Sequence, residues 1–385
     1  SRRRMEGSRM AARAPINPVA LKWARQVGQV SVSDLARALN VKPERIVDFE
    51  GGDALPTFRQ LTLMAKKLDR ALGFFFAPPP SVPDVPATAD FRGRPGETLT
   101  SDLAKEMRRA EQHRNAMLEL ADRQVLRLPV GPIRWDNLAS QAREFREELG
   151  LTQNYVPKSG PNASVFSDWR LLLETHGLLV LQTTGISLTS FRGFSLHHEH
   201  LPVIVVNGAD SPAGKTFTLF HEVAHLINRT SGLCTLQDRV FEEALANNFA
   251  AEFLMPRDEF LTLARDYADV KAFIEELAAH FRVSTLAVAV RLRRFGLIDD
   301  ASLEEVRMAS DDAWERARET TKKKSGFVPQ WKLRYRDLGS TFIGVVAGAL
   351  EDGRVDLVDA TYLLNARLPT VEQMLQEYYS TGGAR

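Results

Sequence analysis

One short segment, Phe217–Ile227, constrains the fold of this chain more than any other. It is apolar apart from Thr218, His221, Glu222 and His225, which predicts a buried helix. Residues four apart lie on one face of a helix, so both imidazoles can reach one ion. Glu222 lies about 100° round the helix, where it can act on a water beside that ion. The segment therefore predicts a zinc site with His221 and His225 as ligands and Glu222 as general base. The alternative is a pair of core histidines.

A catalytic zinc site needs a third protein ligand, and the next predicted helix offers two acids. Glu243 is the preferred ligand, because Asn247 lies one turn further along the same face. From there Asn247 could orient Glu243 or a histidine ligand. Glu242 is the alternative, but it shares a helix face with Phe249 and Phe253, which indicates packing.

Proline divides the chain. Five prolines lie between Ala77 and Arg94, and such a stretch is typical of an extended linker. The predicted parts are a basic arm at 1–17, a helical domain at 18–76, a Pro-rich linker at 77–99, a metallopeptidase domain with a helical extension at 100–300 and a C-terminal helical region at 301–385.

The segment 18–76 has the periodicity of four or five short helices. One is expected at Val32–Leu39, with Ser31 or Ser33 as its N-cap, and the next begins at Pro43 and ends near Phe49. Two helices joined by so short a turn form a helix-turn-helix arrangement.

Beyond the linker, long amphipathic helices are expected from about 100 to 127 and from 137 to 149. The period then changes over Gly177–Leu181, Ser190–Leu196 and Pro202–Val206, which predict a small three-stranded sheet. The rest is helical. The predicted fold class is mainly α, with a small α+β zincin-like peptidase domain, an all-α N-terminal domain and a C-terminal helical region.

Composition narrows the setting. The chain is 44% hydrophobic and 26% charged, as in globular proteins. Its single cysteine, Cys234, rules out an internal disulfide and fits a reducing compartment. With no apolar run of about 18 residues and no secretory signal pattern, the expected location is the cytoplasm, away from membranes. Residues 1–75 carry a net charge of +7 and the remainder −6, so any polyanion contact is expected at the N-terminal part.

Residues 165–298 resemble the ImmA/IrrE family of zinc metallopeptidases, whose motifs occur here in order. The resemblance implies His221 and His225 as ligands, Glu222 as catalytic base and an acid just before Ala-Asn as third ligand. Family members have a second acid there, whereas this chain has Glu243-Ala244-Leu245-Ala246-Asn247; that difference favours Glu243 without excluding Glu242. The matching segments are Glu174–Leu178, Gly193–Ser195, Val203–Asn207, Phe217–Leu226, Ala246–Pro256, Leu277–Ser284 and Arg291–Leu292.

Residues 18–94 resemble the XRE-type helix-turn-helix domain often fused ahead of such peptidases. The resemblance implies a DNA-binding type of fold, with Lys42 and Arg45 on the recognition helix and Arg59 and Gln60 at the start of the next. Glu44 and Asp48 on the same helix would repel phosphate. DNA is therefore a candidate partner of residues 18–76, a homodimer is a candidate assembly, and docking of a partner protein is the alternative. The segments that carry the resemblance are Leu21–Arg25, Leu35–Ala36, Pro56–Leu61, Phe74–Phe76 and Asp90–Arg92.

The main hypothesis is a zinc endopeptidase in regulated proteolysis, cleaving a specific regulatory protein, as some family members cleave a transcriptional repressor. The alternative is a transcriptional regulator whose peptidase-like domain senses a signal with little proteolysis. A third hypothesis is cleavage of the chain's own linker near 78–86. The substrate, the activating signal and the oxyanion-stabilising residue do not follow from the sequence.

Overall fold

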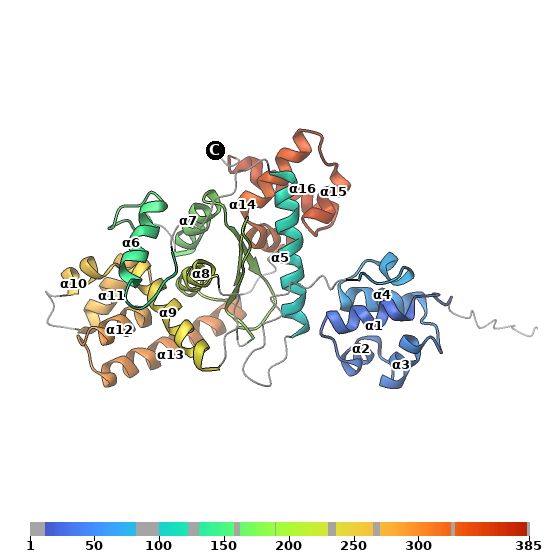
Figure 1. The fold of residues 1–385 in the computed structure, drawn as a ribbon, viewed down its shortest axis with the longest axis horizontal. Coiled ribbons are helices and arrows are strands. Elements are labelled where there is room, and N and C mark those ends of the chain that lie inside the picture. Colours follow the sequence, from blue (N-terminus) through green and yellow to red (C-terminus); the bar gives the residue numbers. More distant parts are fainter. Residues whose placement is uncertain are drawn as a thin grey trace, which may run out of the picture. The chain divides into compact units, whose positions relative to one another are not determined.

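The computed structural model describes residues 12–81, 100–121, 131–157, 162–188, 190–229, 236–264, 270–324 and 328–382. The chain divides into two compact units, Ser1–Glu111 and Gln112–Arg385, whose elements are drawn in Figure 1. Cys234 and the linker residues 82–99 lie outside the described residues. The predicted domain boundaries stay predictions.

The first unit is helical, and its helix ends are set by local side chains. Asn17 caps the first helix, and Ser31, one of the two candidates, caps the second by accepting a hydrogen bond from the Asp34 amide at 3.0 Å. Apolar faces of all the helices meet in one core around Leu21, Phe49 and Leu61. The elements are α1 (Pro18–Val27), α2 (Val32–Leu39), α3 (Pro43–Gly51), α4 (Phe58–Leu68) and the 3-10 helix η1 (Leu72–Phe76).

The predicted pair of helices with a short turn is present as α2 and α3. Asn40 adopts the left-handed conformation that ends α2, and Pro43 begins α3. The two helices pack against each other, and α1 packs against α3, where Arg25 and Glu50 form a two-pronged ion pair at 2.6 and 2.9 Å. The local arrangement matches the expectation, while the assignment to the XRE type stays a prediction.

The second unit contains the one sheet among the described residues. It has three strands in the order β1-β3-β2, namely β1 (Leu179–Thr183), β2 (Gly193–Leu196) and β3 (Val203–Asn207). The central strand β3 runs parallel to β1 and antiparallel to β2. Every residue of β1 and β3 is buried, which explains their unbroken apolar composition. The short strand β2 forms an edge.

Helices α7 (Asn162–Thr175) and α8 (Pro212–Ile227) lie on one side of this sheet (Figure 1). Behind α8 packs α9 (Leu236–Leu254), and α6 (Leu138–Glu148) packs on α9. Aromatic rings fill the space between these layers, and the rings of Phe220 and Phe253 stack with centroids 4.1 Å apart. This core fixes α8 against α9.

The remaining helices extend the second unit. Helix α12 (Thr285–Arg294) packs against α11 (Val270–Phe281) and α13 (Asp300–Lys324). Helix α14 (Gln330–Glu351) packs against β1 and α16 (Leu368–Ser380). Helix α5 (Ser101–Leu120) crosses the division between the units. The predicted helix reached about residue 127, and residues 122–130 lie outside the described part of the chain. The other two helices are α10 (Arg257–Ala264) and α15 (Leu357–Leu363).

The predicted fold class is confirmed as mainly α with a small α+β part. None of the helices in the described part of the chain combines the length and apolar character that crossing a membrane would require.

Candidate metal centre

Helix α8 positions the histidine pair. Ser211 caps its first turn by accepting a hydrogen bond from the Gly214 amide at 3.0 Å, and Pro212 occupies the first helical position. From Thr218 onward nearly every side chain is buried. His221 and His225 lie one turn apart on the face toward α9, and their Nε2 atoms are 3.1 Å apart.

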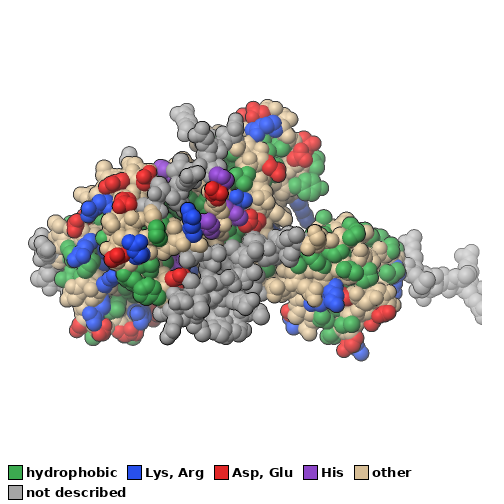
Figure 2. All heavy atoms as spheres, in the orientation of Figure 1, with side chains coloured by type: hydrophobic (Ala, Val, Ile, Leu, Met, Phe, Trp, Pro, Cys, Tyr) green, Lys and Arg blue, Asp and Glu red, His purple; other side chains and the backbone are tan. Residues whose placement is uncertain are grey.

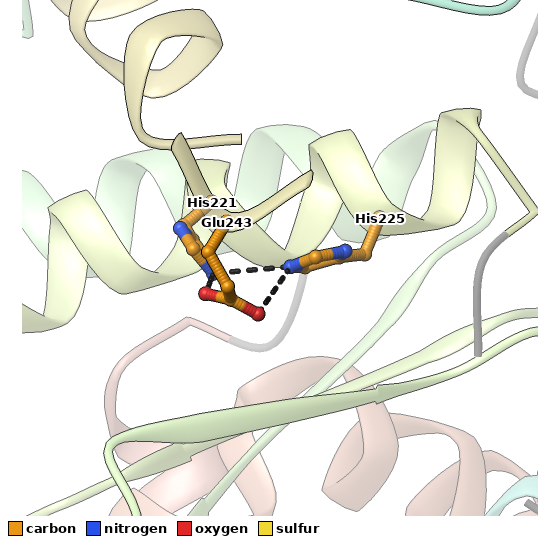
Figure 3. Close-up of side chains that lie close together, drawn as sticks. All are labelled: His221, His225 and Glu243. Atoms are coloured by element: carbon orange, nitrogen blue, oxygen red, sulfur yellow. Dashed lines mark hydrogen bonds and ion pairs between the residues drawn. The ribbon is translucent and has the colours of Figure 1, made fainter. Parts of the chain in front are cut away.

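Helix α9 brings one acid to this pair. One carboxylate oxygen of Glu243 lies 3.1 Å from Nε2 of His221, and the other lies 3.5 Å from Nε2 of His225. Figure 3 shows the three side chains pointing toward one another. They are the one such convergent group of potential metal ligands found in the described parts of the chain. The structure thus brings Glu243 to the histidines, in preference to the alternative, Glu242.

The spacing of these donors fits one tetrahedral ion. Bonds of about 2.0–2.1 Å to zinc place tetrahedral ligand atoms about 3.3 Å apart. The two Nε2 atoms are 3.1 Å apart, and the two oxygens of the Glu243 carboxylate lie 3.1 Å from one of them and 3.5 Å from the other. Two imidazole nitrogens and one carboxylate are also the donor types that catalytic zinc sites use. Both the geometry and the chemistry of the group fit zinc.

Asn247 lies where the sequence predicted a positioning residue. Its Oδ1 accepts a hydrogen bond from Nδ1 of His221 at 3.0 Å. This bond requires a proton on Nδ1 and directs Nε2 of the ring at the cluster, where a bound ion would take the Nε2 lone pair. Of the two partners that the sequence offered, Asn247 thus contacts the histidine.

Glu222 is buried beside the cluster, on the side of the sheet. Ser195 of β2 donates its hydroxyl hydrogen to Oε2 of Glu222 at 2.8 Å. Sequence reasoning did not assign a site role to Ser195. The sequence did show a polar residue, Ser195, in an otherwise apolar strand segment. Only the packing of β2 against α8 shows that Glu222 is the partner of this serine.

Gly193 allows β2 to approach α8 this closely. A Cβ atom at Gly193 would lie 2.5 Å from Cγ2 of Thr218 and 3.4 Å from Cγ of Glu222. The first distance is shorter than real Cβ contacts, so a side chain here would push the strand away from Glu222.

The electrostatics favour an ionised carboxylate among the imidazoles. Burial opposes ionisation of Glu243, but the hydrogen bonds to His221 and His225 outweigh it and hold the pKa of the carboxyl well below its usual range. Burial likewise lowers the pKa of His225, but the hydrogen bond to Glu243 and the charge of Glu222 outweigh it and leave that pKa raised. The group therefore attracts positive charge.

The cluster opens into a cleft of about 800 Å³, a volume in the range of sites that hold small-molecule and peptide-sized ligands. In Figure 2, histidine side chains gather on one face of the second unit with acidic and basic side chains beside them. The cleft is bounded by residues 191–193, where the chain enters β2, and by helices α8, α9 and α12. His221, Glu222, Glu243 and Asn247 are among the residues that line it.

The four residues predicted for DNA contact lie in the first unit. Lys42 is exposed at the start of α3, and Arg59 is exposed on α4. Arg45 forms an ion pair with Asp48 at 3.4 Å. Gln60 uses its side-chain oxygen in the capping box of α4, accepting from the Thr57 amide at 2.9 Å. DNA binding stays a prediction.

Comparison with known proteins supports the peptidase resemblance. Residues 173–293 match the family model described as the IrrE N-terminal-like domain, which belongs to a peptidase family. The match includes all three strands and helices α8 and α9, which carry the convergent side chains. It ends one residue before the end of α12. This region is thus similar to a metallopeptidase-like domain of IrrE type.

Two further comparisons add little detail. The search of curated proteins found no match. Among solved structures, a Mycobacterium tuberculosis transcriptional regulator shares 22% sequence identity with a TM-score of 0.29. That alignment covers 42% of this chain and 47% of the regulator, so the chain spans less than half of that protein's length.

Proposed function

We propose that this protein is a zinc-dependent endopeptidase that acts in regulated proteolysis by cleaving a specific regulatory protein. A transcriptional repressor is the substrate class that the IrrE-type similarity favours. The observation that carries the proposal is the convergence of His221, His225 and Glu243 in a cleft that also holds the buried Glu222.

His221, His225 and Glu243 would hold the ion. When bound, zinc supplies a Lewis acid for the scissile carbonyl and lowers the pKa of water toward about 7. Asn247 fixes the ring of His221 through its 3.0 Å hydrogen bond. The three residues give a set with net charge −1, which leaves a divalent ion with positive charge to act on a carbonyl.

Glu222 is the proposed general base. Ser195 holds its Oε2, so Oε1 is the oxygen that takes the proton from the attacking water. The water oxygen forms the new bond to the carbonyl carbon, the C–N bond breaks, and Glu222 returns the proton to the leaving amine. Atoms and charge balance without any other co-reactant.

Three variants test this assignment in the full chain, with zinc measured by elemental analysis and cleavage measured on a mixed peptide library. Glu222→Gln is expected to keep one zinc ion per chain and to lose about 10²–10⁴-fold of the rate, because it cannot take up a proton. Glu243→Gln is expected to lose zinc and rate together.

The control for the site variants is Glu242→Gln, the neighbouring acid, which is expected to change neither zinc content nor rate. Full cleavage by Glu222→Gln would refute the proposed reaction. The substrate itself would be sought as a cellular regulator that persists in cells carrying Glu222→Gln and disappears in wild type. Regulation that survives this substitution would instead favour a sensing module.

A further inference from the structure

The geometry points to an apolar subsite in the cleft that selects a large uncharged side chain on a substrate residue next to the scissile bond. This inference rests on the proposed peptidase function and adds to it the chemical class of side chain that the protein recognises. It depends on where the cleft runs, on what lines it and on how firmly its walls are held.

The cleft runs away from the metal ligands along α8 and α9. Phe217 and Gly214 line it four and seven residues before His221, which is about 6 and 10 Å at a rise of 1.5 Å per residue. Ala251 lines it eight residues after Glu243. On α9, Glu243 contacts both histidines, and Asn247, one turn later, contacts the earlier one, His221. The two helices are therefore antiparallel here, so the turns of α9 after Glu243 lie beside the turns of α8 before His221. The inner part of the cleft therefore begins at the reacting centre.

Apolar and small side chains line this inner part. Phe217 and Ala251 face it from α8 and α9, and α12 supplies Leu286, Ala287 and Val290. The last two are three residues apart and so share a helix face. An apolar side chain is stabilised by the surface that it buries against such a wall.

Two of the three arginines that line the cleft are paired with acids. Arg192 pairs with Asp210 at 3.0 Å, and Arg291 pairs with Glu252 at 2.7 Å. The guanidinium of Arg294 lies 5.5 Å from the ring centroid of Trp135. The two acids of the cleft, Glu222 and Glu243, lie at the end with the histidines. A charged substrate side chain in the inner part would lose hydration that the apolar side chains of the wall cannot replace.

The α12 wall is held in place, so the width of the subsite is fixed. Arg291 is almost fully buried and joins α12 to α9 through Glu252. Ser284 caps α12 by accepting a hydrogen bond from the Ala287 amide at 3.1 Å. The small methyl groups of Ala251 and Ala287 leave the space that a large side chain would occupy. Filling that space should change which side chain is preferred.

The test uses the full zinc-loaded chain and internally quenched peptides that vary only in the residues beside the cleaved bond. Phe or Leu is expected to exceed Asp and Lys by at least 10-fold in kcat/KM, as differences of one to three kcal/mol in a pocket would give. Ala287→Leu should lower kcat/KM for the Phe peptide at least 10-fold and leave an Ala peptide within about threefold.

Two variants complete the series. Ala279→Leu adds the same atoms at an exposed position of α11 outside the cleft, and it should leave both peptides unchanged. Val290→Phe narrows the cleft from a position that is 48% exposed. If Ala287→Leu fails to fold, Val290→Phe repeats the comparison of the Phe and Ala peptides with a substitution that does not disturb the core.

A binding measurement separates this inference from the peptidase proposal. The same peptides are bound to Glu222→Gln protein and followed by fluorescence anisotropy. One outcome is that Phe and Leu peptides bind selectively, that Ala287→Leu or Val290→Phe removes this selectivity, and that wild type cleaves none of the peptides. This outcome would retain the subsite and reject the peptidase. Cleavage without apolar preference would retain the peptidase and overturn the subsite, as would the absence of any selective binding.

Discussion

At the scale of single residues, Lys215 shows how burial adjusts a charge. It lies near the start of α8, where its Nζ donates to Oε1 of Gln182 at 3.2 Å and lies 5.0 Å from the ring centroid of Phe166. Burial lowers the pKa of the ammonium group to about 8, and the positive charge of Arg336 acts in the same sense. The folded protein therefore carries a charge at neutral pH that its surroundings disfavour.

Lys215→Met is expected to stabilise the protein at pH 7, and the gain should shrink as pH rises. The pKa of an unfolded lysine is about 10.4, so between pH 8 and that value the unfolded chain holds a proton that the folded chain has released. Wild-type stability therefore rises with pH across this window relative to the variant, by at most about 3 kcal/mol. Urea unfolding of both proteins from pH 7 to 10 measures the difference, and a difference that stays constant would contradict the expectation.

At the scale of elements, helix α14 is broken at Gly339, and a side chain from another helix compensates for the break. Gly339 has φ 81° and ψ 157°, a conformation that only glycine adopts readily. Arg170 of α7 donates to the carbonyls of Arg336 and Leu338 at 2.8 and 2.6 Å. It also pairs with Glu174 at 2.9 Å, and Thr341 donates to Glu174 at 2.6 Å. The break thus ties α14 to α7 through buried polar contacts.

Gly339→Ala is expected to destabilise the second unit by about 2 kcal/mol or more, because of backbone strain. In addition, a Cβ atom would clash with the guanidinium of Arg170. The matched control is Gly348→Ala in the same helix, where a Cβ atom meets nothing within 4 Å. There the change should stabilise by roughly 0.5–1 kcal/mol. Thermal and urea unfolding compare them, and equal effects would show that the break is not required.

At the scale of the whole molecule, each of the two units has its own apolar core. One is built around Leu21 and Phe49, and the other around Phe220 and Phe253. The candidate metal ligands all belong to the second unit. Binding of an ion should therefore stabilise one unit directly and leave the other nearly unchanged.

Zinc at 100 times its dissociation constant is expected to stabilise the second unit by about 2.7 kcal/mol. Hydrogen exchange of the full chain, with zinc and with a chelator, measures the change in stability of each unit separately. Amides of α8 and α9 should gain protection, while those of α1 to α4 should not. The variant His225→Ala serves as the control and should show no zinc-dependent change. Equal protection in both units, or none, would contradict the assignment of the ligands.

What the sequence determined by itself is local. The spacing of His221 and His225 is one helical turn, so a single helix suffices to place both rings together. The three strand segments, the cap at Ser31 and the helix start at Pro43 also follow from short-range patterns, and the structure confirms these elements. The ends of the three strands differ from the expected ones by up to three residues, because hydrogen bonds to neighbouring strands decide where each strand ends.

What only the tertiary structure decided depends on contacts between distant segments. Two adjacent acids, Glu242 and Glu243, were open as third ligand because the rotation of α9 against α8 cannot be read from either helix alone. The packing of Phe220 on Phe253 fixes that rotation and brings Glu243 to the imidazoles. Ser195 reaches Glu222 because β2 lies at the sheet edge beside α8. Helix α12 lines the cleft because a buried arginine joins it to α9, a contact between residues 39 apart in the chain.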